Sequence, residues 1–343
     1  MIVKSFGKND GANVNEVVLQ NSNNSVSIIS YGAITRDWRV LHHNKEVSVL
    51  LGFNSLGAYK SDKNFIGIIA GRVANRIERG RFTISGTEYQ LGLNDYPNHL
   101  HGGYLGFGKQ NWDVDIDSRQ PSVRLTRVSP HLEEGYPGEV NVTVTISLVG
   151  NSLTYEMFAK PDRATPINLA QHNYYNLMGE SDIWSHRFQT IARRYTPVDK
   201  YLIPTGEIRS LKEISDGFNS IVNHKQQVRI EELDPNKKGI DINLVIDQTK
   251  GIKKSVAKIF AENGLSLEIF TDELGVQFYT GANLVSDKRG HSGAKYKPFE
   301  GFCLEPQNFP SCPTIEAFPN SIYTPDNPYK QKTTIKICGN GEI

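Results

Sequence analysis

Short runs of alternating apolar and polar residues recur from one end of the chain to the other. The clearest spans Val140–Val149, where apolar side chains occupy every second position. This period of two is typical of a β-strand with one buried face and one face in water. Other segments with strand character are Ser25–Ser30, Val47–Leu51, Arg81–Leu91, Ser122–Val128, Leu153–Phe158, Val256–Phe260, Leu265–Phe270 and Val276–Gly281.

Turn-forming pairs separate several of these runs. Ser85-Gly86, Gly150-Asn151 and Asn263-Gly264 each join two segments in the way that hairpin turns do, which predicts antiparallel neighbours. Helical periodicity is almost absent, apart from a helix-like piece at Leu211–Ile214. The pattern therefore predicts an all-β fold, a large antiparallel β-sandwich with few short helices. Because no repeat or flexible linker interrupts it, we expect one domain over residues 1–343.

Charge and composition limit the classes of molecule that the protein is expected to bind. The 38 Lys and Arg residues balance 37 Asp and Glu, so nothing favours nucleic acid or an anionic membrane over a neutral small molecule. Neither a signal peptide nor an apolar stretch approaching ~18 residues is present, which predicts a soluble cytoplasmic protein without a membrane segment. Protein partners are not predicted. Cys303, Cys312 and Cys338 suit neither a zinc site nor a redox pair and are expected to be reduced thiols.

Two polar clusters lie in the first third of the chain among apolar or glycine-rich neighbours, where unpaired charge is costly. Residues 71–77 contain Arg72, Asn75 and Arg76, whose guanidinium and amide groups could donate to sugar hydroxyls or form structural ion pairs. Residues 97–103 contain His99 and His101, followed by two glycines that permit close backbone approach to a ligand. On a strand these imidazoles point to opposite faces, which argues against a shared metal ion.

Two further clusters occur later. In residues 168–177, His172 lies among amides and next to Tyr174 and Tyr175, whose rings offer flat faces for a pyranose or could simply pack in the core. In residues 301–310, Glu305 is a single carboxylate in a run that is otherwise suited to burial. Desolvation should raise its pKa towards the range of a general base, although a buried structural salt bridge is an alternative. Asp241 and Gln277 are weaker candidates of the same kind.

These segments, in this order, resemble the galactose mutarotase (aldose 1-epimerase) family. The resemblance rests on Gly-Arg-Val-Ala-Asn-Arg-Ile, Leu-His-Gly-Gly, His-Asn-Tyr-Tyr-Asn-Leu and Leu-Glu-Pro-Gln-Asn-Phe-Pro, and it covers essentially the whole chain. It implies the family's β-supersandwich and an enzyme that interconverts the α and β anomers of free hexoses such as galactose and glucose. No cofactor and no metal are expected, because the reaction moves protons and no electrons.

The resemblance also implies a role for each candidate residue. Glu305 would be the general base and His172 the general acid, facing one cavity about a sugar ring apart. The implied substrate-binding residues are Asn75, Arg76, His101, Asp241 and Gln277.

The chain departs from the family pattern at two places. Ile242-Asn243-Leu244 replaces the usual His-Asn-Phe, and Ser311 stands where Asp is common, which is expected to alter the lip of the site.

Three alternatives remain open from the residues. A hexose-6-phosphate 1-epimerase would need a cationic pocket, which Arg72 and Arg76 could supply. A non-catalytic sugar-binding module would lack the acid–base pair, whereas both its members are present here. A His-ligated metalloenzyme would lose activity to chelators, and we expect no such loss.

Overall fold

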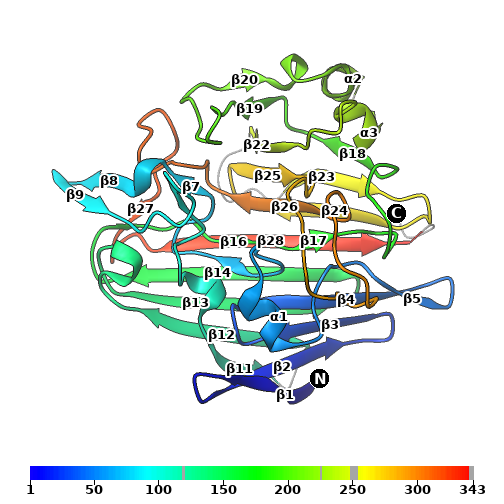
Figure 1. Ribbon diagram of the computed structural model, residues 1–343, viewed down its shortest axis with the longest axis horizontal. Helices are drawn as coiled ribbons and strands as arrows, with labels where there is room; N and C mark the ends of the chain where they lie inside the picture. The colour runs from blue at the N-terminus through cyan, green and yellow to red at the C-terminus, as the bar shows by residue number, and fades with distance from the viewer. Residues whose placement is uncertain (118–119, 225, 248–253, 340–343) are drawn as a thin grey trace.

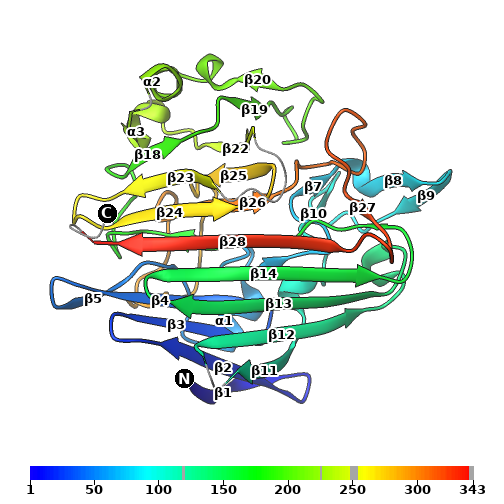
Figure 2. The same ribbon diagram turned by 180° about the vertical axis from the view of Figure 1, so that it is seen from behind.

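The computed structural model describes residues 1–117, 120–224, 226–247 and 254–339. Antiparallel sheets form two layers, which Figures 1 and 2 show from opposite sides. The layers enclose one extensive apolar core, to which both contribute.

The first layer is a single long sheet. Among the described residues it holds nine strands, and each pairs antiparallel with its neighbours. In spatial order they are β11 (Asp113–Asp117), β12 (Ser122–Ser129), β13 (Val140–Val149), β14 (Ser152–Pro161), β28 (Tyr329–Cys338), β24 (Ser266–Thr271), β23 (Lys254–Phe260), β18 (Arg187–Thr190) and β21 (Val228–Arg229).

The second layer consists of two smaller sheets. The N-terminal sheet contains β1 (Ile2–Asn9), β2 (Ala12–Gln20), β3 (Asn24–Ile29), β4 (Ile34–His42) and β5 (Lys45–Ser48) in chain order. The other sheet contains, in spatial order, β17 (Tyr174–Tyr175), β26 (Phe302–Gln307), β25 (Gly275–Tyr279), β22 (Asp241–Val245), β19 (Arg194–Thr196) and β20 (Arg209–Ser210).

Short strand pairs and a few helices complete the described structure. The strand pairs are β6 (Ile69–Ala70) with β16 (Ala170–Gln171), β7 (Arg76–Ile77) with β10 (His99–Leu100), β8 (Arg81–Ile84) with β9 (Thr87–Gln90), and β15 (Thr165–Pro166) with β27 (Ile322–Tyr323). The helices are α1 (Leu56–Ser61), α2 (Asp216–His224) and α3 (Ile230–Leu233), with 3-10 turns η1 (Glu78–Gly80), η2 (Phe107–Lys109), η3 (Glu133–Gly135) and η4 (Leu211–Glu213). None of the helices seen in the described ranges has the length and apolar character needed to cross a bilayer.

The predicted all-β sandwich is confirmed, and so are its three hairpins. Ser85-Gly86 joins β8 to β9, Gly150-Asn151 joins β13 to β14, and Asn263-Gly264 lies between β23 and β24. The helix-like piece is the 3-10 turn η4. The strand predicted at Val47–Leu51 was placed too late, since β5 ends at Ser48 and the apolar residues that follow are buried outside any strand.

Alternation along the strands explains why the layers pack. In β13 the even-numbered residues from Val140 to Leu148 are apolar and buried, and the burial pattern repeats with period two. The core joins Trp38 of β4 and Ile146 of β13 with Phe278 of β25, all of them fully buried. Removing such side chains from water stabilises the sandwich at roughly 25 cal/mol per Å² of apolar surface.

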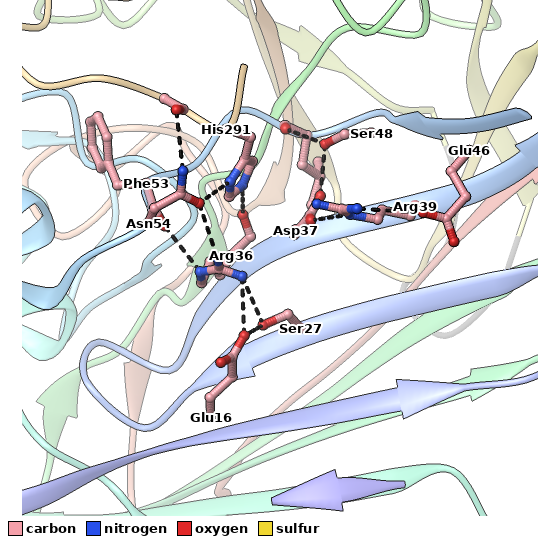
Figure 3. A network of polar contacts seen from close by, with 12 residues as sticks. Glu16, Ser27, Arg36, Asp37, Arg39, Glu46, Ser48, Phe53, Asn54 and His291 are labelled. Carbon is pink, nitrogen blue, oxygen red and sulfur yellow. Dashed lines mark hydrogen bonds and ion pairs between the residues drawn. The ribbon is translucent and has the colours of Figure 1, made fainter. Parts of the chain in front are cut away.

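A polar network fastens the long connection between β25 and β26 to β4 (Figure 3). The Arg36 guanidinium donates to Glu16 Oε1 at 3.0 Å and to Asn54 Oδ1 at 3.2 Å. His291, in the connection, approaches the same Asn54 oxygen at 3.1 Å and the backbone oxygen of Arg36 at 2.8 Å. This anchoring matters for the site, because β25 and β26 carry two of the candidate residues.

Candidate active site

A cavity of about 410 Å³ opens beside the sheet formed by β17, β26, β25 and β22. This volume falls in the range of roughly 300–1,000 Å³ that is usual for small-molecule sites. The lining side chains are mostly polar, and they come from segments far apart in sequence. They are Asp62, Lys63, Asn64, Phe65, Asn75, Arg76, Asn94, Asp95, Leu100, His101, Tyr104, Lys109, His172, Tyr174, Asp241, Gln277, Tyr279, Asn283 and Glu305.

Glu305 is placed by β26, in the middle of the sheet. Its register partner on β25 is Gln277, so the two side chains lie in one row on the same face. Glu305 is 2 % exposed, and its Oε2 has no hydrogen-bond partner. The Gln277 Oε1 is also buried and unpartnered. Because buried polar atoms are normally hydrogen-bonded, these two oxygens are suited to meet the donors of a ligand.

His172 reaches the cavity from the short segment between β16 and β17. Its backbone N–H donates to the Ile68 carbonyl at 2.8 Å, and its own carbonyl accepts from Gly67 at 2.9 Å, so the chain is held on both sides. The imidazole Nε2 lies 3.8 Å from Glu305 Oε1. This distance is shorter than the sugar-ring separation expected from the sequence.

Burial favours the neutral forms of both groups. Desolvation raises the pKa of Glu305 well above its usual value, and the nearby Asp241 charge adds to the effect. Desolvation lowers the pKa of His172 to about 4. The contact is therefore better described as a pair sharing one proton, favoured on the carboxyl, than as a salt bridge between two full charges.

His101 and His99 diverge, as their spacing predicts. His101 lines the cavity, and its Nδ1 accepts the backbone N–H of Asn75 at 3.2 Å, which leaves the proton of the neutral ring on Nε2. Burial lowers the pKa of His101 well below its usual value, helped by His172 and Arg76. His99 points elsewhere, with Nδ1 2.7 Å from the Gly92 oxygen and Nε2 2.7 Å from the Tyr136 hydroxyl.

Arg76 and Asn75 enter through β7, which pairs with β10 and so brings residues 75–76 beside His101. The Arg76 Nε donates to Asp95 Oδ2 at 2.7 Å, and 16 % of the arginine side chain is exposed. Asn75 has a positive φ of 63°, a conformation that asparagine tolerates better than most residues. Its Oδ1 accepts the N–H of Arg76 at 2.8 Å, which fixes the turn into β7.

Asp241 begins β22, on the far side of β25 from Glu305. The Gln277 amide donates to Asp241 Oδ1 at 2.5 Å. Burial raises the pKa of Asp241, although this hydrogen bond and the Arg76 charge oppose the shift. Ile242, at the position where the resembled family commonly has histidine, alternates to the opposite face and packs against the core. The replacement therefore does not change the wall of the cavity.

The structure brings all seven predicted site residues to this one cavity and places several of their neighbours elsewhere. Tyr174 lines the cavity, but Tyr175 is fully buried in the core. Gly102 allows close approach to the Gly71 carbonyl rather than to a ligand, since a Cβ there would lie 1.7 Å from that oxygen. Ser311 is buried rather than at the lip, and its N–H donates to the Arg76 carbonyl at 2.9 Å.

The sequence reasoning missed several lining residues. Phe65 carries its ring 4.7 Å from that of His101 and 6.1 Å from that of His172, yet no local pattern marks it. Asp95, the ion-pair partner of Arg76, could have been suspected only from its position just before the polar segment that contains His99. Tyr279 lies two residues beyond Gln277 on the same strand face and could have been inferred from that period.

Arg72 is a structural residue outside the cavity lining. It is 1 % exposed, and burial lowers its pKa to about 10. Its guanidinium donates to backbone carbonyl and hydroxyl oxygens rather than to a carboxylate. The acceptors are Pro137 O, Gly138 O, Thr165 Oγ1, Ser129 O, Ser129 Oγ and Pro130 O. It therefore supplies no cation for a phosphate, contrary to the possibility left open by the sequence.

Replacing Arg72 should affect stability rather than substrate binding. Arg72→Lys cannot reproduce the planar fork, and the buried acceptors left without donors should cost roughly 2–4 kcal/mol of unfolding free energy in urea titrations. The matched variant Arg76→Lys alters a cavity residue and should instead raise KM with little loss of stability. A substrate KM raised by Arg72→Lys as much as by Arg76→Lys would show that this division is wrong.

One cluster beside the cavity contains residue types that can bind a metal ion. One ligand atom from each of His172, Cys303 and Glu305 lies within 4.8 Å of the others. Metal ligands are normally deprotonated, so the Cys303 thiol and the Glu305 carboxyl would have to lose their protons to bind a cation. Burial opposes that loss, since it raises both pKa values well above their usual ranges. The cluster fits proton transfer better than metal ligation.

Comparison with known proteins assigns the family. The family model for aldose 1-epimerase matches residues 15–336. The chain is 38 % identical to galactose mutarotase of Rattus norvegicus over 95 % of both chains, and 30 % identical to aldose 1-epimerase of Escherichia coli over 86 % of both. The crystal structure of an aldose epimerase homologue from C. elegans superimposes with a TM-score of 0.87, at 26 % identity, covering 95 % of this chain and 99 % of that one.

The chain therefore belongs to the aldose 1-epimerase family. This membership confirms the predicted resemblance and the predicted class of enzyme, an isomerase that acts on carbohydrates.

Proposed function

We propose that this cavity interconverts the α and β anomers of free hexoses such as D-galactose and D-glucose, with Glu305 and His172 as the proton-transfer pair. The observation that carries the proposal is their contact: a buried carboxyl group with an unpartnered oxygen lies 3.8 Å from a buried imidazole at the wall of a sugar-sized cavity.

The chemistry needs one base, one acid and no net change in protons. Once the shared proton has moved from the Glu305 carboxyl to His172, Glu305 takes the proton of the anomeric hydroxyl while His172 gives one to the ring oxygen, and the bond between C1 and that oxygen breaks to leave an aldehyde. After rotation about C1–C2, Glu305 returns its proton to the carbonyl oxygen and His172 recovers its own from the hydroxyl. Each such group typically contributes about 10²- to 10⁴-fold to the rate.

The short distance between the two groups suits this reaction. The anomeric oxygen and the ring oxygen are both bonded to C1, so the acid and the base must reach atoms that are close neighbours. A separation of 3.8 Å serves this geometry better than the wider one expected from the sequence. One proton shared by the pair is also sufficient, because ring opening and ring closure pass it in opposite directions.

The other five residues would hold the sugar while C1 stays free to rotate. Arg76 and the Nε2–H of His101 offer donors, and Asp241 offers acceptor oxygens. Asn75 and Gln277 add amide groups, of which the Gln277 oxygen still lacks a partner. Tyr174 supplies an aromatic face beside His172, with ring centroids 5.2 Å apart. Such a mixture of paired polar groups and an aromatic face suits a monosaccharide.

A hexose 6-phosphate is a less suitable substrate. Lys63, Arg76 and Lys109 line the cavity, but so do Asp62, Asp95, Asp241 and Glu305, and Arg76 is already paired with Asp95. A phosphate of about two negative charges would meet no cationic excess here.

Polarimetry separates the candidate substrates. Freshly dissolved α-D-galactose and α-D-glucose should reach equilibrium faster with the enzyme, whereas α-D-glucose 6-phosphate should follow its spontaneous rate. Acceleration of the phosphate alone would favour the phosphate-specific alternative. Binding of galactose without any acceleration would favour a sugar-binding module and contradict the proposal.

A further inference from the structure

Strand β26 presents two side chains to the same imidazole. Cys303 and Glu305 are two residues apart, so they lie on one face of the strand. The Glu305 carboxyl faces the Nε2 of His172 at 3.8 Å, and the Cys303 Sγ lies 3.7 Å from its Nδ1. The contact to sulfur is within the reach of a weak hydrogen bond. Side chains of one strand therefore lie beside both ring nitrogens of His172.

The surroundings keep Cys303 as a thiol. It is fully buried, it pairs in register with Tyr174, and burial raises its pKa well above the usual value, with the charges of Glu305 and Asp241 adding to the shift. A hydrogen bond with the Tyr174 side chain acts in the opposite direction. A protonated thiol can accept a hydrogen bond through sulfur without adding charge to the site.

The aromatic neighbours of His172 do not duplicate this contact. The rings of His101, Tyr174 and Phe65 have centroids 5.1, 5.2 and 6.1 Å from the His172 ring and pack against it at an angle. The backbone of His172 itself also favours the protonated ring. Within the described ranges, the Cys303 thiol is the side-chain partner found for Nδ1.

His101 shows what a different partner does. Its Nδ1 faces a backbone N–H, which can only donate, so the neutral ring must carry its proton on Nε2. A sulfur atom can accept, and it therefore permits the opposite tautomer, with the proton on Nδ1 and a free Nε2. Proton exchange with a sugar at Nε2 requires that second tautomer whenever His172 has given its proton away.

We propose that Cys303 is a positioning residue: its sulfur accepts the Nδ1–H of His172 and thereby confines proton exchange to Nε2, the nitrogen that faces Glu305 and the sugar. This inference rests on the proposed function of His172. Because sulfur is a weak acceptor, it orients the ring without stabilising the imidazolium as a carboxylate would. His172 then gives up its proton readily.

The first test needs no substitution. Two-bond ¹H–¹⁵N correlation spectra of the full chain at neutral pH should show opposite neutral tautomers for the two cavity histidines, with the proton on Nδ1 in His172 and on Nε2 in His101. A proton on Nε2 of His172 would overturn the proposal. The spectrum is independent of turnover, so it separates this failure from a failure of the proposed anomer interconversion, which polarimetry of the wild type reports.

The second test is kinetic. Cys303→Ala should lower kcat roughly 10-fold, the lower end of the effect known for orienting partners of metal-ligating histidines, with KM changed less than about twofold. The His172 spectrum should move to a mixture of tautomers. Cys303→Ser, which keeps an acceptor, should restore most of kcat and the single tautomer.

Cys338→Ala is the matched control. Cys338 is also a buried thiol, but it ends β28 in the large sheet and does not line the cavity. It should lose stability as Cys303→Ala does and keep its wild-type kcat and tautomers. If Cys303→Ala behaves like Cys338→Ala in kcat and spectrum, the thiol only fills space and the proposal is wrong.

Discussion

Glu305→Gln should abolish most of the activity and at the same time make the protein more stable at neutral pH. The amide keeps the shape of the side chain but cannot take a proton, so kcat should fall by about 10²- to 10⁴-fold. The same change removes a carboxyl whose ionisation the buried site opposes. Stability and activity are therefore expected to move in opposite directions, as they often do at active sites.

The stability gain has a defined pH dependence. The pKa of Glu305 is higher in the folded than in the unfolded protein, so its protonated form favours the fold. The wild type should lose stability as pH rises from the unfolded value of about 4.3 through the folded pKa, by ~1.4 kcal/mol for each unit between them. Glu305→Gln should lack this loss. Thermal unfolding at pH 4 and pH 8 measures the difference.

Glu268→Gln is a control for which the expected change in stability at high pH has the opposite sign. Glu268, on β24, forms an ion pair with Lys258 at 2.7 Å. Burial opposes ionisation of Glu268, but the hydrogen bonds from Lys258 and Ser255 and the charges of Lys258 and Lys336 together lower its pKa. Its replacement should slightly destabilise the protein at pH 8 and leave kcat unchanged. If Glu305→Gln were destabilised at pH 8 in the same way, the carboxyl would not be a strained, desolvated group.

The pH dependence of the wild-type rate should be a broad bell set by the shared proton. Below about pH 4 His172 gains a proton while Glu305 keeps its own, and the pair loses its base. As the pH rises through the elevated pKa of Glu305, the pair loses its last proton and has no acid. The two apparent values belong to the pair rather than to either residue.

Initial rates of α-D-galactose equilibration across pH 3–10 measure this profile. The spontaneous rate must be subtracted at each pH, since free acid and base also catalyse ring opening, and fluorescence must show that the protein stays folded. A lower limb near pH 6.5, the ordinary histidine value, would contradict the strong desolvation of His172.

Much of the fold could be predicted from local patterns. Period-two alternation located β13 and β14, and turn pairs located their hairpin, because both signals depend on residues close in sequence. Strands such as β26 gave no such signal. All six of its residues are buried, so the apolar and polar positions do not alternate. How β26 pairs with β25 and β17 depends on long-range packing that local patterns do not contain.

The candidate site was predictable as a set of residues but not as a geometry. Motif resemblance selected Glu305 and His172, yet their 3.8 Å contact arises from two chain segments that only the sheet brings together. The contact between Cys303 and the His172 ring could not be predicted either, because the sequence indicates only a reduced thiol at this position. Tyr175 shows the reverse case: it belongs to the same motif, and the structure places it in the core, one of the two roles that the sequence left open.

The central claim is that Glu305 and His172 act as one unit. The most direct measurement is the kcat for α-D-galactose, by polarimetry, of wild type, Glu305→Gln, His172→Asn and the double variant. Because ring opening requires acid and base together, each single variant should lose nearly as much activity as the double variant. Losses that multiply in the double variant, or a folded Glu305→Gln with near-wild-type kcat, would contradict the claim.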